Sequence, residues 1–505
     1  MPDFPTLAAV DLGSNSFHLQ VARVVGEQIY PLDGLREPVR LGAGLRDDKV
    51  LDEPSQERAI ECLMRFGERL RGLPNEAVRA VGTNTLRVAK NAKGFLKRAQ
   101  AALGVPIDII AGREEARLIY LGVAHSLPMT RERRLAFDIG GGSTEFIIGS
   151  GLKPLKLDSL YMGCVSWSMR YFADGKITKS ALKAAELAAR TELQTITSSF
   201  SRKHWSEAVA SSGTARSIAE VMHLNGMGDG TITPEGIDAL RAAILKAGDI
   251  ERLELNGLRT DRTSVLPGGF AILSAIVNEL KIDSVTIATG ALRQGILWDL
   301  LGRVHHHDMR DVTVSQLMRR YHVDAAQARR VGRLANKLLK RILDDENAET
   351  GRQLIDWAAS LHEIGITVAY SGYHKHSAYI LRNADMPGFS RMEQERLALL
   401  VLAHRGQLRK FGEVPVADDD WPLVVALRLA ALFHRSRADA SLPELSLKRR
   451  NGSFVLGLPD EWLNDNPLTE TALREEINLW RGSGRSLEVR MTGAQDSGID
   501  LLSAA

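Results

Sequence analysis

Up to about residue 300, short stretches in which apolar and polar residues alternate are separated by stretches with helical apolar spacing. The alternating stretches predict strands at Ala8–Leu12, Phe17–Val25, Ala77–Thr83, Ile107–Ala111, Leu135–Ile139, Phe146–Ile148, Ala208–Ser211 and Ser284–Thr289. The stretches between them predict helices that include Glu53–Leu70, Ala92–Leu103, Glu114–His125 and Lys179–Ser198. Strands alternating with helices predict mixed sheets covered by helices, and therefore an α/β fold.

After Arg303 the pattern changes to amphipathic helices. These are expected at Val312–Tyr321, Ala325–Asp344, Gln353–His362, Arg391–Ala403 and Trp421–Ser436. A short α+β unit should follow, with strands at Glu444–Arg449, Ser453–Leu458 and Ser486–Arg490 around a helix near Glu470–Trp480. We therefore expect four domains, at residues 1–124, 125–302, 303–440 and 441–505.

Composition narrows the class of protein. Apolar residues make up 44% of 505 residues, which is ample for several hydrophobic cores. Cys62 and Cys164 are the two cysteines, a usage that suits a reducing compartment. No apolar run reaches the length of a membrane span, so we expect a cytoplasmic protein, with peripheral membrane association left open. The net charge of +3 gives no reason to expect a nucleic-acid partner.

A loop of small residues occurs twice, each time between two predicted strands. The first copy is Asp11-Leu12-Gly13-Ser14-Asn15-Ser16, and the second is Asp138-Ile139-Gly140-Gly141-Gly142-Ser143-Thr144-Glu145. Such turns expose successive backbone N–H groups that bind phosphate oxygens. One copy would be an ordinary hairpin turn as readily as a phosphate site, but the duplication favours a phosphate chain held from both sides.

The other common phosphate motifs are missing from the sequence. It lacks the P-loop pattern, and Gly140–Gly142 is not spaced as in dinucleotide-binding folds. Two hairpin loops in consecutive α/β segments instead resemble the duplicated RNase H-like fold of the actin, sugar-kinase and Hsp70 superfamily.

Three further segments add candidate phosphate and catalytic groups. Gly82–Arg87 follows a predicted strand and enters a helix, so Arg87 could bind a phosphate at the helix N-terminus. The alternative is an ordinary Thr or Asn helix cap followed by a solvent-exposed arginine. Gly112–Arg117 opens another helix, and its carboxylates either favour the helix dipole or supply a general base. Ser212-Gly213-Thr214 is a phosphate-facing turn or a plain helix cap. The carboxylates Asp11, Asp138, Glu115 and Glu145 suit a Mg²⁺-dependent phosphoryl-transfer site.

Five motifs in order now point to one family. They are Asp11–His18, Gly112–Arg117, Asp138–Glu145, Met162–Val165 and Gly290–Arg293. Together they resemble the exopolyphosphatase and guanosine pentaphosphate phosphohydrolase family, and the resemblance continues through Leu361–Gly365 and Ser371–Leu381.

The resemblance implies roles for individual residues. Glu115 corresponds to the glutamate that activates water, with Glu145 supporting it or replacing it as the base. Asp138 and the two loops match the metal- and phosphate-binding positions of the family. Together with the local patterns above, the candidate metal ligands are Asp11, Asp138 and Glu145, binding Mg²⁺ or another divalent cation. The candidate phosphate-binding residues are Gly13, Ser14, Asn15, Ser16, Arg87, Gly140, Gly141, Gly142, Ser143, Thr144, Ser212, Gly213 and Thr214. The family also implies a homodimer and removal of the terminal phosphate of inorganic polyphosphate.

The helical half resembles HD phosphohydrolase domains but has an incomplete set of metal ligands. His362-Glu363 stands where a functional site would have His-Asp. His305-His306-His307 is expected to be a solvated loop rather than a metal site, because consecutive side chains point in different directions.

Basic residues gather on one side of the helix predicted at Ala325–Asp344. They form either a solvated face or a track for a long polyanion. The track would consist of Arg330, Arg333, Lys337, Lys340 and Arg341, joined by His374, Lys375, His376, His404 and Arg405.

We therefore expect an exopolyphosphatase that removes orthophosphate processively from polyphosphate. The first alternative is a guanosine pentaphosphate 5′-phosphohydrolase. An ATP-dependent kinase or chaperone-like switch of the same superfamily, and a sensing module without turnover, are further alternatives. The kinase or switch would need a Gly-Gly adenosine turn near Gly213.

Overall fold

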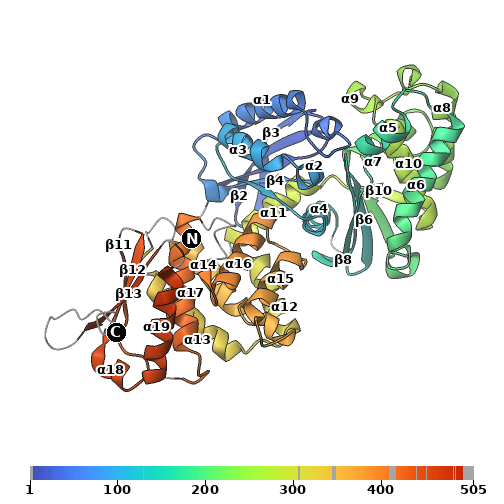
Figure 1. The fold of residues 1–505 in the computed structure, drawn as a ribbon. Coiled ribbons are helices and arrows are strands. Elements are labelled where there is room, and N and C mark those ends of the chain that lie inside the picture. Colours follow the sequence, from blue (N-terminus) through green and yellow to red (C-terminus); the bar gives the residue numbers. More distant parts are fainter. Residues whose placement is uncertain are drawn as a thin grey trace. The chain divides into compact units, whose positions relative to one another are not determined.

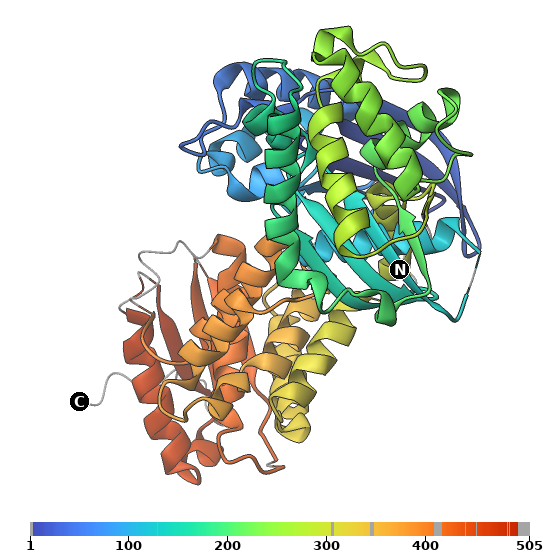
Figure 2. The same ribbon diagram turned by 90° about the vertical axis from the view of Figure 1, so that its right-hand side faces the viewer.

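The structure is a computed structural model that describes residues 4–128, 130–304, 308–343, 348–408, 417–439, 441–450, 452–481, 483 and 485–492. His305, His306 and His307 lie outside the described residues. The chain forms two compact units (Figures 1 and 2), one of Met1–Met309 with Pro387–Arg391 and one of Arg310–Met386 with Met392–Ala505. The sequence predicted four domains, whereas the structure groups the chain in two and moves the main boundary from residue 302 to residue 309.

The first unit contains two five-stranded sheets with the same topology. The sheet of the first lobe has the order β3-β2-β1-β4-β5 and that of the second lobe β8-β7-β6-β9-β10. In each, the first three strands form antiparallel hairpins and the last two run parallel to the first strand. The strands are β1 (Thr6–Leu12), β2 (Phe17–Val25), β3 (Gln28–Glu37), β4 (Val78–Gly82), β5 (Ile107–Ile109), β6 (Arg133–Ile139), β7 (Thr144–Ser150), β8 (Lys153–Leu160), β9 (Glu207–Ala210) and β10 (Val285–Ile287). This repeat is the duplicated RNase H-like fold that the sequence predicted.

Helices connect the parallel strands, as crossover connections require. The helices of the first unit are α1 (Glu53–Leu70), α2 (Asn84–Val88), α3 (Ala92–Leu103), α4 (Gly112–Ser126), α5 (Cys164–Tyr171), α6 (Lys179–Thr197), α7 (Gly213–Leu224), α8 (Pro234–Ala247), α9 (Thr260–Thr263), α10 (Leu266–Glu279) and α11 (Leu292–Val304). The helices predicted at Glu53–Leu70 and Ala92–Leu103 have the predicted bounds. The edge strands β3 and β8 were not predicted, because few of their side chains are buried: none in β3 and only Leu160 in β8.

The two lobes exchange their last helices. Helix α4 follows β5 of the first sheet but packs against β7 and β8 of the second, and α11 follows β10 but packs against β1 of the first. The two helices cross closely, because a Cβ atom on Gly295 would lie 1.7 Å from the carbonyl oxygen of Leu118. A buried apolar cluster that includes Ala9, Ile119, Ala136 and Ile296 joins both sheets to these helices.

The second unit consists of helices followed by a small three-stranded sheet with order β11-β12-β13. Its elements are α12 (Met309–Arg320), α13 (Ala325–Leu339), α14 (Ala348–Leu361), α15 (Tyr373–Asn383), α16 (Arg391–Ala403), α17 (Trp421–Phe433), β11 (Ser446–Arg450), β12 (Ser453–Pro459), α18 (Asp460–Asn464), α19 (Pro467–Arg481) and β13 (Leu487–Thr492). Helix α17 is almost wholly buried and packs against α13, α14 and α19, so the final α+β segment shares the core of this unit. Within the described residues, no helix has the length and apolarity to cross a membrane.

Candidate functional site

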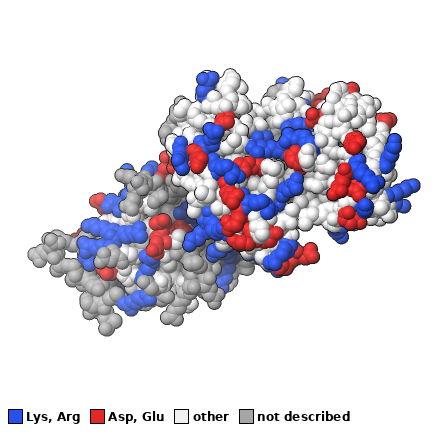
Figure 3. Space-filling view, turned by 90° about the horizontal axis from the view of Figure 1, so that it is seen from above, with Lys and Arg blue, Asp and Glu red and all other residues white. Residues whose placement is uncertain are grey.

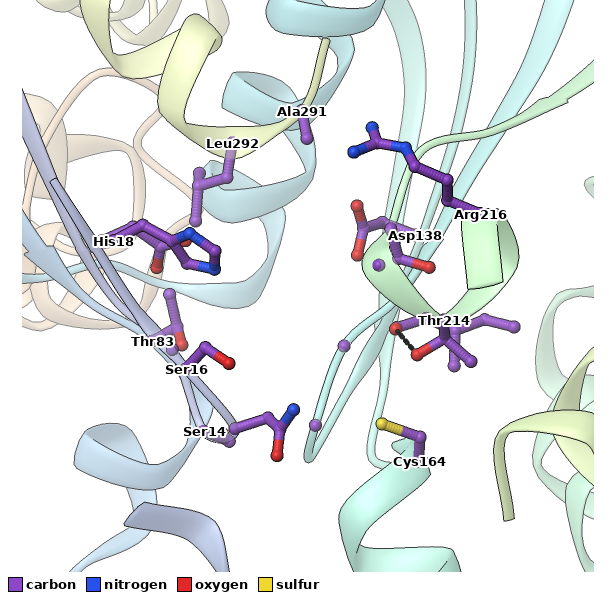
Figure 4. A pocket seen from close by; sticks show the side chains of 18 of the residues that line it. Ser14, Ser16, His18, Thr83, Asp138, Cys164, Thr214, Arg216, Ala291 and Leu292 are labelled. Atoms are coloured by element: carbon purple, nitrogen blue, oxygen red, sulfur yellow. Dashed lines mark hydrogen bonds between the residues drawn. The ribbon is translucent and has the colours of Figure 1, made fainter. Parts of the chain in front are cut away.

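A pocket of about 270 Å³ lies between the two lobes of the first unit. Both duplicated loops line it, the first through Gly13–Ser16 and the second through Gly140–Ser143. Figure 4 shows Ser14, Ser16 and His18 on one side, facing Asp138, Thr214, Arg216 and Cys164 on the other. The loops meet directly, since a Cβ atom on Gly141 would lie 2.9 Å from Cβ of Ser14 and 3.1 Å from the backbone nitrogen of Asn15. Glycine at position 141 therefore permits the two loops to approach.

The loop of the first lobe buries several polar atoms that have no hydrogen-bond partner among the described residues. They are Oδ1 of Asp11, both amide atoms of Asn15, Oγ of Ser16 and Nδ1 of His18. Buried polar groups in folded proteins are nearly always hydrogen-bonded. Their convergence on one pocket indicates a place for a polar ligand.

A third turn completes the floor of the pocket. Ser212, Gly213 and Thr214 stand at the start of α7 and line the pocket, as the sequence suggested. Oγ of Ser212 accepts a hydrogen bond from the Ala215 N–H at 3.0 Å, and the Thr214 hydroxyl donates to the Ile139 carbonyl at 3.0 Å. Both side chains thus serve the turn itself, and the helix N-terminus offers backbone N–H groups to an anion.

Two aspartates, one from each hairpin, line the pocket. Burial raises the pKa of Asp11 to about 7, and the nearby carboxylate of Glu115 adds to the effect. Burial likewise raises the pKa of Asp138 to about 7, although the Ser211 hydroxyl, which donates to Oδ2 of Asp138 at 2.5 Å, favours its ionised form. A bound cation would stabilise the ionised form of both desolvated carboxylates.

Glu115 lies in the first turn of α4 and lines the pocket. Nη1 of Arg87 donates to its Oε2 at 2.7 Å and also to the Ile110 carbonyl at 2.9 Å. Arg87 does not line the pocket, so the structure gives it a different task from the phosphate clamp predicted from the sequence. It balances the charge of Glu115 and fixes the carboxylate in place.

Glu145 lies behind these groups rather than at the pocket surface. It is 1% exposed, and its Oε1 accepts a hydrogen bond from the Ser159 hydroxyl at 2.8 Å. Burial and the nearby Glu115 carboxylate raise its pKa well above the usual value. Thr144 also points away from the pocket, because its hydroxyl donates to the Met162 carbonyl at 2.6 Å.

The predicted set of three metal-binding carboxylates does not come together. Within the described ranges, no group of three or more His, Cys, Asp or Glu side chains is arranged to hold a metal ion. Asp11 and Asp138 line the pocket, whereas Glu145 does not. This arrangement still fits Mg²⁺, which commonly takes one or two carboxylates and completes its shell with water and substrate phosphates.

Sequence reasoning missed a group of basic side chains on the pocket wall. They are Arg36, Arg216, Arg259, Arg262 and Arg293. Nη2 of Arg36, from the first lobe, lies 2.6 Å from Oδ2 of Asp261 in the second lobe, so an ion pair spans the two lobes. Only Arg293 stood in a recognised motif, Gly290–Arg293. Arg36 lies on the edge strand β3, and Arg216 lies in the first turn of α7, two residues after Thr214. Arg262 lies in the short helix α9, and Arg259 is the N-cap of that helix.

Charged side chains of both signs lie on the surface of the first unit. On the face that Figure 3 shows, basic side chains are interspersed with acidic ones.

In the second unit, the predicted polyanion track is only partly exposed. Arg333, Lys337, Lys340 and Arg341 are exposed, and Arg330 pairs with Asp439 at 2.6 Å. His404 is 3% exposed and bonds to the Val401 carbonyl and the Tyr373 hydroxyl, so its inclusion in a solvent-facing track was wrong.

The histidines of the second unit form a packed cluster. The rings of His362 and His404 lie 5.0 Å apart, and that of His374, which is half-buried, lies 6.3 Å from His404. Lys375 and Arg405 are exposed, with Arg405 over the Tyr373 ring, and His376 is half-buried.

Comparison with known proteins places the fold in a family. Two RNase H-like lobes, each with a loop of small residues at a common pocket, define the class of fold. The sequence pattern of the Ppx/GppA phosphatase family matches residues 20–304, and that of domain III of the Ppx/GppA phosphatases matches residues 309–477. The chain belongs to the Ppx/GppA phosphatase family.

Solved structures show the same fold. An exopolyphosphatase from Cytophaga hutchinsonii is 23% identical, with a TM-score of 0.54 over 59% of this chain and 98% of that one. The Ppx/GppA family member from Aquifex aeolicus is 24% identical, with a TM-score of 0.51 over 60% of this chain and 99% of that one.

Proposed function

We propose that this protein is an exopolyphosphatase that hydrolyses the terminal phosphoanhydride bond of inorganic polyphosphate and releases orthophosphate. The observation that carries the proposal is the pocket itself. Two loops with exposed backbone N–H groups, five arginines and the Glu115 carboxylate converge with Asp11 and Asp138 on a space that fits a short run of phosphates. Most of the residues that line the pocket are polar or charged, which suits an inorganic chain.

In the proposed reaction, the terminal phosphorus lies between the loops and a water molecule attacks it in line with the leaving oxygen. Glu115 accepts the proton of that water, and Arg87 holds the carboxylate toward the pocket. Backbone N–H groups of Gly13–Ser16 and Gly140–Ser143 would bind the equatorial oxygens, where negative charge increases. Glu145 would act from behind by keeping Ser159 and the start of α4 in place.

Asp11 and Asp138 are the residues that would hold a divalent cation, Mg²⁺ in our proposal. The unpartnered Oδ1 of Asp11 fits this role. When bound, such an ion neutralises phosphate oxygens and orients the chain.

The second candidate is hydrolysis of guanosine pentaphosphate, the other activity that the resemblance in sequence implies. The test is to incubate the purified protein with long-chain polyphosphate, guanosine pentaphosphate or ATP in the presence of Mg²⁺, and to measure phosphate release. Polyphosphate should give the highest kcat/KM. Faster phosphate release from guanosine pentaphosphate would favour a guanosine pentaphosphate phosphohydrolase over an exopolyphosphatase. Dominant hydrolysis of ATP would reject both functions.

We propose in addition that the exposed cations of α13 contact the distal part of a long chain, and that the protein is a homodimer. Each phosphate contact releases counterions, so neutralising Arg333 and Lys337 should weaken binding of long chains and make its salt dependence shallower. Neutralising Lys93 and Lys97 on α3 is the matched control. Equal effects of both double variants would reject the track, and analytical ultracentrifugation tests the dimer.

A further inference from the structure

A short segment from the sequence of the second unit is built into the first unit. Residues Pro387–Arg391 belong to the first unit, although the chain on both sides, up to Met386 and from Met392, belongs to the second. Phe389 is 2% exposed and Ser390 is fully buried. A segment this deeply buried contributes to the core of the unit that it enters.

Both backbone polar groups of Gly388 bond to side chains of the exchanged helices. Its N–H donates to Oε2 of Glu114 on α4 at 2.8 Å, and its carbonyl accepts from Nη2 of Arg303 on α11 at 2.7 Å. The φ angle of Gly388 is +91°, a conformation that residues with a side chain rarely adopt. The segment is therefore fixed to α4 and α11 by a backbone geometry that suits glycine.

Glu114 is the centre of a buried ion network. Arg117 donates to it twice, each time at 2.8 Å, and Arg117 and Arg79 both pair with Asp299. Nε of Arg303 lies 3.1 Å from Oδ2 of the same aspartate. Three guanidinium groups thus surround two carboxylates, and the Gly388 N–H is a further donor to Glu114.

The network holds the turn that carries Glu115. Helix α4 begins at Gly112 with Ala111 at its N-cap, which has no side-chain capping bond. The first turn is instead fixed by Arg87 on the pocket side and by the bonds of Glu114 on another face. Because Glu114 and Glu115 are neighbours in this turn, a shift of one moves the other.

We propose that the segment Pro387–Arg391 is a positioning element that aligns Glu115 for catalysis, acting through Gly388 and Glu114. The proposal rests on the proposed role of Glu115 as the base. A displacement of about 1 Å at a reacting group can cost roughly a hundredfold in rate. Loosening the segment should thus lower kcat while leaving KM nearly unchanged, because the phosphate-binding loops are not involved.

The experiment uses the full-length chain and tripolyphosphate, a substrate too short to depend on distant contacts. Phe389→Ala loosens the segment, Phe389→Leu is the conservative rescue, and Ile244→Ala in α8 is a control that removes buried apolar volume outside the pocket and the network. Phe389→Ala should lower kcat at least tenfold, with KM within threefold of wild type. Phe389→Leu should retain most of the wild-type kcat. Ile244→Ala should lower only the melting temperature.

Hydrogen exchange gives a readout that does not depend on turnover. Amides of residues 112–118 should exchange faster in Phe389→Ala than in Ile244→Ala at equal melting temperature. Unchanged kcat and exchange in folded Phe389→Ala would overturn the proposal. If Phe389→Ala does not fold, the same two measurements are made on Gly388→Ala, because a side chain at this positive φ strains the segment. A wild-type protein inactive on all polyphosphates would reject the proposed function, and the exchange comparison would still test the segment.

Discussion

The two hairpins that face the pocket have the same strand register, but they differ in the side chain opposite the shared aspartate. In the first lobe Asp11 pairs across the strands with His18, and in the second Asp138 pairs with Glu145. Each hairpin thus places one aspartate at the pocket and one further side chain directly opposite it. The aspartate was kept in both copies, whereas its partner differs.

The partners differ in charge as well as in shape. Burial and the nearby Arg293, Arg36 and Arg262 guanidiniums hold the pKa of His18 far below its usual range, so its imidazole is neutral. Burial and Glu115 raise the pKa of Glu145, which adds an acidic group near the base. The duplicated loops can therefore share phosphate binding while proton transfer is confined to the side of α4 and the second hairpin.

The largest effect should come from the base itself. Glu115→Gln keeps the size of the side chain and its bond to Arg87 but cannot accept a proton. We expect kcat to fall by roughly two to four orders of magnitude with polyphosphate binding nearly intact. Phosphate release and equilibrium binding measure the two quantities. Near-wild-type turnover would move the role of base to Glu145.

The two metal candidates should respond alike. Asp11→Asn or Asp138→Asn should raise the Mg²⁺ concentration for half-maximal activity by roughly tenfold or more, since each removes a charged oxygen ligand. A Mg²⁺ titration of phosphate release provides the measurement. If only one variant shifts, the cation belongs to a single hairpin.

The equivalent partners should respond unequally. Glu145→Gln should lower kcat by roughly tenfold or more, because it removes an acidic group that supports the start of α4. His18→Gln replaces one neutral group by another and should change kcat less than threefold. Comparable losses in both variants would show that the two hairpins share the chemistry after all.

The smallest effect concerns stability and pH without ligand. The pKa of His18 in the folded protein lies below its value of about 6.5 in the unfolded chain. The contribution of the neutral imidazole to the free energy of unfolding is therefore complete above about pH 6.5 and is lost as the pH falls. At pH 5 the loss is about 2 kcal/mol, and His18→Gln should abolish it. The pKa of Glu145 is raised in the folded protein, so its effect on the free energy of unfolding has the opposite dependence on pH. Glu145→Gln should therefore stabilise the protein at pH 7 but not near pH 4. Urea unfolding at three pH values checks both signs.

Local patterns were sufficient for much of the fold. Asp52 caps α1, and the helix keeps its predicted bounds because an apolar stripe follows the cap. The duplicated Asp-turn pattern likewise indicated both pocket loops, since a turn of small residues has its effect within a few positions. The exposed strand β3, however, carries Arg36 to the pocket without any such pattern.

The sequence by itself determined the paired loops, the candidate base Glu115 and the change from α/β to helical structure after residue 303. Each of these depends on spacing within about twenty residues. Only the tertiary structure decided that α4 and α11 exchange lobes, that Arg87 serves Glu115, and that Gly388 reaches Glu114. Those contacts join residues 28 to 274 positions apart. Contacts between residues far apart in the sequence depend on which buried charges and apolar surfaces complement one another. The local spacing of residues does not predict such contacts.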